Sequence, residues 1–156
     1  HLCDRRQRQM CIRDRYDKCD GCKSCSVACM QAHREDEGTV YDLDMTDPKN
    51  ESRNFILKDS KGRYKPLFCR HCDDPECVKS CMSGALKRDP ESGHVFYDEE
   101  RCGSCFMCVM NCPFGVLKPD SVTNSKVIKC DFCVNAGGEP SCVAACPTKA
   151  IFVEEV

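Results

Sequence analysis

The stretch CGSCFMCVMNCP, residues 102–113, contains four cysteines spaced C-x2-C-x2-C-x3-C and ends with a proline. Residues 19–29, CDGCKSCSVAC, repeat this spacing. Two further groups keep the first and last intervals but lengthen the middle one, to four residues within 69–81 and to eight within 130–146. The sixteen cysteines that follow residue 15 therefore form four quartets: Cys19, Cys22, Cys25 and Cys29; Cys69, Cys72, Cys77 and Cys81; Cys102, Cys105, Cys108 and Cys112; and Cys130, Cys133, Cys142 and Cys146.

The composition leaves little material for an ordinary apolar core. Cysteine accounts for 18 of the 156 residues, whereas Leu, Ile, Val and Phe together contribute 29 and Trp is absent. Disorder is not expected, because the 23 basic residues nearly balance the 25 acidic ones. Cross-links through the cysteines are therefore needed to hold the fold together. Disulfides, zinc ions and iron–sulfur clusters can each provide them.

The quartet spacing favours [4Fe-4S] clusters among these three. Two-residue gaps let three successive thiolates surround one face of the cube, and the fourth cysteine, entering a helix that leads away, binds a neighbouring cluster. Zinc prefers two C-x2-C pairs about 12 to 20 residues apart, and each of the two longer quartets has only one such pair. Disulfides need an oxidising compartment, and nothing in the sequence indicates one, so they are disfavoured. No secretory signal or membrane span is recognisable, so we expect a soluble, cytoplasmic protein.

Residues 1–15, HLCDRRQRQMCIRDR, do not fit the rest of the chain. They contain five Arg against two Asp, and without them the chain carries 18 basic and 23 acidic residues, a net charge of −5. The string resembles translated sequencing-adapter read-through, and a disordered basic tail is the alternative. We therefore predict a separate segment over 1–15, and we exclude Cys3 and Cys11 from the metal sites.

The segments around the quartets predict short elements. Short β-like or turn segments are expected after the quartets, at 84–86, 114–117 and 150–153, and strands before them, at 95–97 and 126–128. A hairpin is expected over 55–68, and brief helices are expected to carry the fourth cysteine of each quartet. The acidic stretch 35–47 is expected to be a solvated face. His71, between two cysteines, is expected to be a solvated loop residue, with a hydrogen bond to a cluster sulfur as the alternative. His33 and His94 are weaker candidates for that role.

Four longer strings carry a family resemblance. They are FCRHCDDPECVKSCMSGAL, DPESGHVFYDEERCGSCFMCVMNCPFG, KCDFC and SCVAACPTKAI. Together they resemble the four-cluster polyferredoxin family, which includes the iron–sulfur subunits of dimethyl sulfoxide reductase, formate dehydrogenase and hydrogenase systems. The segments MSGAL and FMCVMNCPFG are most similar to the CO dehydrogenase iron–sulfur (CooF-type) branch. The likeness covers residues 17–153.

This resemblance implies an α+β fold of two interleaved ferredoxin-like (bacterial dicluster) modules, with short strands and short helices around the clusters. The four-cluster domain would span 16–156, with an outer module from 16–32 and 126–156, an inner module from 66–119 and an insertion over 33–65. The resemblance also implies four [4Fe-4S] clusters, whose ligand sets are Cys19, Cys22, Cys25 and Cys146; Cys29, Cys130, Cys133 and Cys142; Cys69, Cys72, Cys77 and Cys112; and Cys81, Cys102, Cys105 and Cys108.

The implied function is electron transfer without a catalytic residue or a small-molecule substrate. The expected partner is a catalytic redox subunit of an anaerobic system, namely a CO dehydrogenase, hydrogenase, formate dehydrogenase or molybdopterin enzyme, with a membrane-anchor subunit as a further candidate. No phosphate-binding glycine loop is present, and every quartet is complete. An iron–sulfur redox sensor and a structural zinc module are the alternatives. Nucleic acid is not an expected partner, because the acidic balance opposes phosphate binding.

Overall fold

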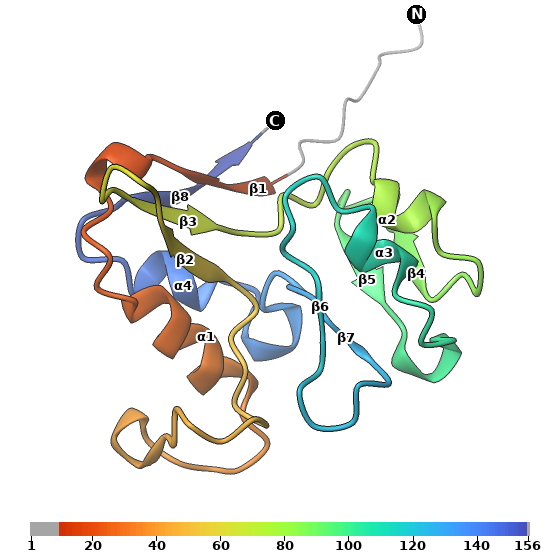
Figure 1. The fold of residues 1–156 in the computed structure, drawn as a ribbon, viewed down its shortest axis with the longest axis horizontal. Coiled ribbons are helices and arrows are strands. Elements are labelled where there is room, and N and C mark those ends of the chain that lie inside the picture. The colour runs from red at the N-terminus through yellow and green to blue at the C-terminus, as the bar shows by residue number, and fades with distance from the viewer. Residues whose placement is uncertain (1–9, 156) are drawn as a thin grey trace, which may run out of the picture.

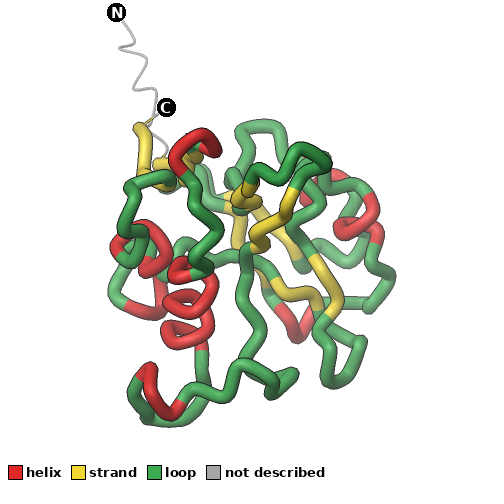
Figure 2. The backbone as a smooth tube through the Cα atoms, turned by 60° about the vertical axis from the view of Figure 1, so that its left-hand side comes forward, coloured by secondary structure: helices red, strands yellow, loops and turns green. Residues whose placement is uncertain are grey.

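The computed structural model describes residues 10–155, and side chains from 12 to 154. Within this range the protein is an α+β structure of short elements joined by loops, which make up most of the chain trace in Figure 2. The α-helices are α1 (Ser24–His33), α2 (Glu76–Lys79), α3 (Met107–Met110) and α4 (Ser141–Ala144). The 3-10 helices are η1 (Tyr16–Lys18), η2 (Val40–Asp42), η3 (Glu99–Arg101) and η4 (Val134–Ala136).

The strands form four antiparallel pairs. They are β1 (Met10–Asp14) with β8 (Ile151–Glu155), β2 (Phe55–Lys58) with β3 (Tyr64–Leu67), β4 (Leu86–Arg88) with β5 (Val95–Tyr97), and β6 (Lys118–Pro119) with β7 (Val127–Ile128). The first pair joins the two ends of the described chain, with Ile12 opposite Val153. Isolated pairs of this size are marginal in water. The strands therefore depend on packing against the rest of the fold.

Sequence-distant segments gather in each half of the molecule. In Figure 1, α1, α4 and the pairs β1–β8 and β2–β3 lie on the left, and α2, α3, β4 and β5 lie on the right, with β6 and β7 between the halves. Two apolar clusters follow the same division. One contains Leu86, Val95, Val116, Leu117 and Val127 with Cys69 and Cys108, and the other contains Ile12, Phe68, Phe132 and Ile151 with Cys25 and Cys142. Cysteines thus complete both small cores.

Most of the expected strands are present. The hairpin is confirmed, since Phe55 pairs with Leu67 and Lys58 with Tyr64. Strands also lie at or beside the expected positions 84–86, 95–97, 126–128 and 150–153. Of the two forms expected at 114–117, the structure has the turn, at residues 113–114, and the two-residue strand β6 begins only at Lys118. Val116 and Leu117, between the turn and the strand, are buried in the core.

The helices differ from the expectation that they carry the fourth cysteine of each quartet. That holds only for α1, which includes Cys29. The helices α2, α3 and α4 end two residues before Cys81, Cys112 and Cys146. Proline explains two of these endings, because Pro113 and Pro147 disfavour a helical conformation at the cysteine before them.

Part of the segment 1–15 belongs to the fold. Residues 1–9 lie outside the described residues, but β1 pairs along its length with β8, and Ile12 is fully buried. Arg70 donates a hydrogen bond to the carbonyl of Ile12 at 3.1 Å and forms an ion pair with Asp14. Residues 10–14 therefore contact the rest of the fold in the structure.

None of the helices in residues 10–155 is long and apolar enough to cross a membrane.

Candidate metal centres

One local pattern positions the third cysteine of every quartet. Cys25, Cys77, Cys108 and Cys142 are each the second residue of their helix, α1 to α4 in that order. In the two short quartets the residue before the helix takes a left-handed conformation, with φ of 60° at Lys23 and 54° at Phe106. In the two long quartets it is Pro75 or Pro140 in an extended conformation. Both solutions turn the chain sharply from the cysteine loop into the helix.

Three cavities in the described part of the chain have four cysteines each in their walls. The first is lined by Cys19, Cys22, Cys25 and Cys146, the second by Cys29, Cys130, Cys133 and Cys142, and the third by Cys69, Cys72, Cys77 and Cys112. Their volumes, including the space at the mouth, are about 300, 300 and 330 Å³. Each wall contains three cysteines from one quartet and one from another. Four thiols around one cavity are the donor set that a [4Fe-4S] cube requires.

The contacts in the structure relate three of the four remaining predicted ligands, which are Cys81, Cys102, Cys105 and Cys108. Burial raises the pKa of the Cys108 thiol, and the neighbouring charges of Cys81 and Cys102 raise it further. These three side chains therefore lie close enough to interact. Cys105 is exposed to solvent, as is Cys22 in the first cavity.

The interior thiols are costly to ionise before a metal binds. Burial raises the pKa of Cys25 and of Cys77 to about 11 and that of Cys142 to about 12, and it also raises the pKa of Cys130. Iron binds the thiolate, so cluster formation must displace these protons. The pKa of Cys146 is lowered despite burial, because backbone N–H groups of Ile151 and its neighbours point at the sulfur.

Backbone N–H groups also donate directly to sulfurs of the predicted ligands. Arg53 donates to Cys29 Sγ at 3.3 Å, Phe132 to Cys130 Sγ at 3.4 Å, and Ala150 to Cys146 Sγ at 3.3 Å. Such hydrogen bonds stabilise negative charge on sulfur, and they are one way a protein sets the potential of an iron–sulfur cluster. The donation from Arg53 comes from the segment 33–65 predicted as an insertion, so that segment contacts a predicted ligand.

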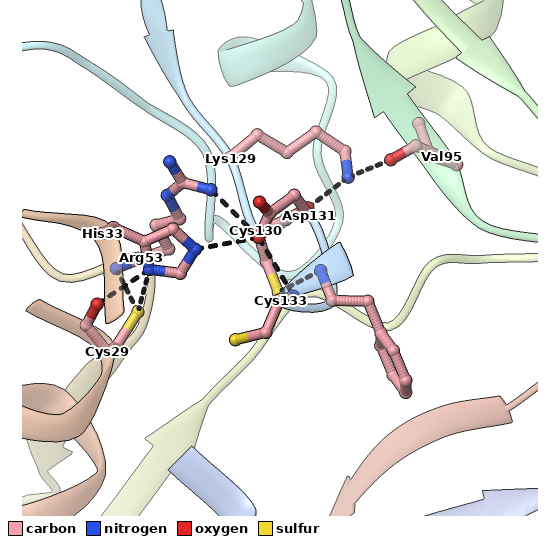
Figure 3. A network of polar contacts seen from close by, with 9 residues as sticks. Cys29, His33, Arg53, Val95, Lys129, Cys130, Asp131 and Cys133 are labelled. Atoms are coloured by element: carbon pink, nitrogen blue, oxygen red, sulfur yellow. Dashed lines mark hydrogen bonds and ion pairs between the residues drawn. The ribbon is translucent and has the colours of Figure 1, made fainter. Parts of the chain in front are cut away.

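A charged network fixes α1 against the fourth quartet, as Figure 3 shows. Asp131 Oδ1 lies 2.9 Å from His33 Nε2 and 3.0 Å from an Arg53 guanidinium nitrogen, and it accepts from the Cys133 N–H at 3.1 Å. Nδ1 of His33 lies 2.7 Å from the carbonyl of Cys29. Burial alone would lower the pKa of His33, but the hydrogen bond to Asp131 raises it to about 10. The network joins Cys29 and Cys133, two cysteines of the second cavity.

The expectation for His71 is wrong. Its side chain is fully buried, and burial lowers its pKa to about 2, so the ring is neutral. Nδ1 accepts a hydrogen bond from the Val95 N–H at 3.0 Å. The ring packs edge-on against Phe132, with 5.8 Å between the ring centroids, and it also contacts His94. This histidine is part of the interior that separates the second and third cavities.

Sequence reasoning missed Lys129, which precedes Cys130. Only 6% of this lysine is exposed, and its ammonium donates to the carbonyls of Val95 at 2.6 Å and Cys130 at 2.7 Å. The one signal in the sequence is the apolar pair Val127 and Ile128 before it, which makes a buried strand plausible. Lysine is almost never fully buried, so that signal is weak.

Comparison with known proteins agrees with a cluster-binding chain. The family model of the 4Fe-4S dicluster domain matches residues 60–156. The Escherichia coli (strain K12) protein YsaA, which is named for electron transport, is 36% identical over 135 residues, which cover 86% of this chain and 82% of YsaA. The iron–sulfur subunit of nitrate-inducible formate dehydrogenase from the same strain is 35% identical over 147 residues, covering 85% of this chain but only 50% of that subunit.

A solved structure extends the likeness to nearly the whole chain. The active site complex BamBC of benzoyl coenzyme A reductase, in complex with zinc, has a chain that aligns with a TM-score of 0.50 and 26% identity. The alignment covers 94% of this protein and 78% of that chain. The family match over most of the sequence and the alignment with YsaA across most of both chains show that the protein belongs to the family of 4Fe-4S dicluster domain proteins.

Proposed function

We propose that this chain is an electron-transfer subunit that holds four [4Fe-4S] clusters in two interleaved ferredoxin-like modules. The observation that carries the proposal is the composition of the three cavity walls, each with three cysteines from one quartet and one from a distant quartet. When bound, the cubes supply one-electron chemistry. The chain supplies the thiolate ligands, N–H donors to sulfur and a buried surrounding.

The ligand sets follow those implied by the family resemblance. Cys19, Cys22, Cys25 and Cys146 form the first set; Cys29, Cys130, Cys133 and Cys142 the second; Cys69, Cys72, Cys77 and Cys112 the third; and Cys81, Cys102, Cys105 and Cys108 the fourth. The influence of Cys81 and Cys102 on the pKa of Cys108 supports the fourth set. The pairing of β1 with β8 and the hydrogen bond from the Arg53 N–H to Cys29 Sγ support including residues 10–14 and Arg53 in the outer module.

Exposure of the ligands supports an order along the relay. The first and fourth sets each contain one exposed cysteine, Cys22 and Cys105, whereas no cysteine of the second or third set is exposed. We place the first and fourth clusters at the two ends, where a partner can approach, and the second and third between them. Electrons would pass one at a time between partners bound at the two ends.

The relatives are named as electron transport proteins or iron–sulfur subunits, which is consistent with a non-catalytic chain that serves a catalytic redox subunit. The resemblance of MSGAL and FMCVMNCPFG to the CooF-type branch supports a CO dehydrogenase as the first partner to test. Hydrogenase, formate dehydrogenase and molybdopterin enzymes come next. The test mixes the oxidised, cluster-loaded protein with each enzyme and its reducing substrate. Fast bleaching of the clusters with one enzyme identifies that partner, and equally slow bleaching with all of them contradicts the assignment.

Metal and sulfide analysis of the full chain, purified without oxygen, tests the cofactor. Four cubes predict about 16 iron and about 16 acid-labile sulfide per chain. About four zinc without sulfide would refute electron transfer and favour a structural zinc module.

Serine variants then test the shared ligand sets. Cys19→Ser and Cys146→Ser, at opposite ends of the chain, are expected to abolish the same electron paramagnetic resonance signal. Cys142→Ser lies in the same quartet as Cys146 but is expected to remove a different signal. Loss of one common signal in Cys142→Ser and Cys146→Ser, with another signal lost in Cys19→Ser, would refute the shared sets.

A further inference from the structure

Lys129 occupies the boundary between the second and third cavities. One of its two carbonyl acceptors belongs to Cys130, which lines the second cavity, and the other belongs to Val95, which lines the third. Figure 3 shows the ammonium reaching from the Cys130 segment to Val95 on β5. This single side chain therefore connects the walls of two candidate cluster sites in the two halves of the molecule.

The positive charge has no carboxylate beside it. Among the carboxylates whose side chains the structure describes, none lies within 4 Å of the Lys129 ammonium, and both of its hydrogen bonds go to neutral carbonyls. A buried ammonium is unfavourable unless negative charge compensates it. Loaded cavities would provide that charge, because each cube with four thiolates is a net anion.

We propose that Lys129 is a potential-setting residue for the second and third clusters, the central pair of the relay. Adding an electron to either cube increases its negative charge, and a buried cation beside both cubes stabilises that reduced state. Lys129 thereby raises both central reduction potentials relative to the two end clusters. Transfer of an electron from an end cluster to the central pair is therefore favourable. The two central clusters keep similar reduction potentials, which allows transfer between them.

The test is a redox titration of the loaded protein, followed by electron paramagnetic resonance, with Lys129→Met compared with wild type. Methionine keeps much of the length and apolar stem of lysine but removes the charge. We expect two of the four clusters to show at least a tenfold smaller equilibrium constant for reduction, which is about 59 mV for a one-electron couple. The other two are expected to change by less than half of that potential shift.

Lys126→Met is the matched control, because it removes one lysine charge three residues earlier. The ammonium of Lys126 is on the surface, with 49% of its side chain exposed and Glu99 at 3.0 Å. No cluster potential is expected to move in this variant. The inference is overturned if Lys129→Met leaves all four potentials unchanged, shifts all four equally, or behaves like Lys126→Met.

Loss of clusters from Lys129→Met would call for two further variants. Lys129→Gln keeps an N–H donor without the charge, and Lys129→Arg keeps the charge with a different shape. Iron bound by the arginine variant but not by the glutamine variant supports a requirement for the cation, and iron lost from both overturns it. The inference rests on the proposed function, but the two fail differently: wild type without iron and sulfide refutes the function, whereas a loaded protein with unmoved potentials refutes only the role of Lys129.

Discussion

Asp131→Asn is expected to loosen the contact between α1 and the fourth quartet. The substitution keeps the size of the side chain but leaves His33 and Arg53, which lie 2.9 and 3.0 Å from the carboxylate, without a negative partner. Breaking a fully buried ion pair costs about 3–5 kcal/mol, and an exposed pair contributes about 0–1 kcal/mol. The side chains of His33, Asp131 and Arg53 are 10%, 21% and 25% exposed. We therefore expect a loss of about 2–3 kcal/mol, toward the buried limit.

The assay is thermal unfolding of the loaded protein without oxygen, followed by loss of the cluster absorption at one fixed heating rate. For a chain of this length, each kcal/mol lowers the midpoint by about 2–4 °C, so we expect a fall of about 4–12 °C. A single heating rate is needed because release of the clusters is irreversible.

Asp73→Asn provides the control, since it makes the same chemical change beside Cys72. The carboxylate of Asp73 is 71% exposed and forms an ion pair with Arg88 at 2.9 Å. Little change is expected, because an exposed pair contributes little to stability. Equal midpoint shifts for Asp73→Asn and Asp131→Asn would refute the reasoning from burial.

Three further substitutions test other parts of the structure. Ile12→Ala is expected to lower the stability by about 2–4 kcal/mol because the side chain is fully buried; an unchanged midpoint would show that β1 is not part of the fold. Gly21→Ala is expected to reduce the iron content, because Gly21 lies between Cys19 and Cys22 and a distortion there would displace both. A Cβ at this position would lie 2.5 Å from the Tyr64 ring, at a φ of 77°. Gly103→Ala, where a Cβ meets no atom within 4 Å, should retain full iron. Glu51→Gln should be destabilising at neutral pH only: burial opposes ionisation, but Lys118 and Ser121 still lower the folded pKa of Glu51. That contribution is full above the unfolded pKa of about 4.3 and is lost as pH falls through the folded value; a wild-type advantage that persists in strong acid would contradict it.

The cysteine frame could be predicted from sequence because the ligand spacing of a cube is local. Three ligands lie within one loop, so their intervals can be recognised without knowledge of the rest of the fold. The positions of the helices were harder to predict, since a helix of four residues such as α2 has no apolar period to detect. The helix α2 begins directly after Pro75 and has Cys77, the third cysteine of its quartet, as its second residue. A search for apolar periodicity does not use these two local signals.

Ile12, His71 and Lys129 have surroundings that come from far along the chain, so their burial could not be predicted from the sequence. Ile12 is buried by β8, whose residues lie about 140 positions later, and MCIRD alone gives no strand period. Lys129 and His71 are buried, and each makes a hydrogen bond to the backbone of Val95, which lies 34 and 24 positions away in the sequence. Lysine and a loop histidine are ordinarily solvated, so composition predicts the opposite of what long-range packing produces.

The distribution of cysteines among the cavities couples cluster binding to folding. Cys146 shares a wall with Cys19, and Cys112 shares one with Cys69, so neither donor set is complete until sequence-distant segments meet. Closing such long loops costs conformational entropy, but that cost rises only slowly with loop length. The two apolar cores are small and already include cysteines. Because metal binding to a site that is absent from the unfolded chain contributes its free energy to folding, the clusters would supply the cohesion that the apolar residues lack. The same bonds would hold the relay together and hold the protein folded, so a ligand substitution should affect both.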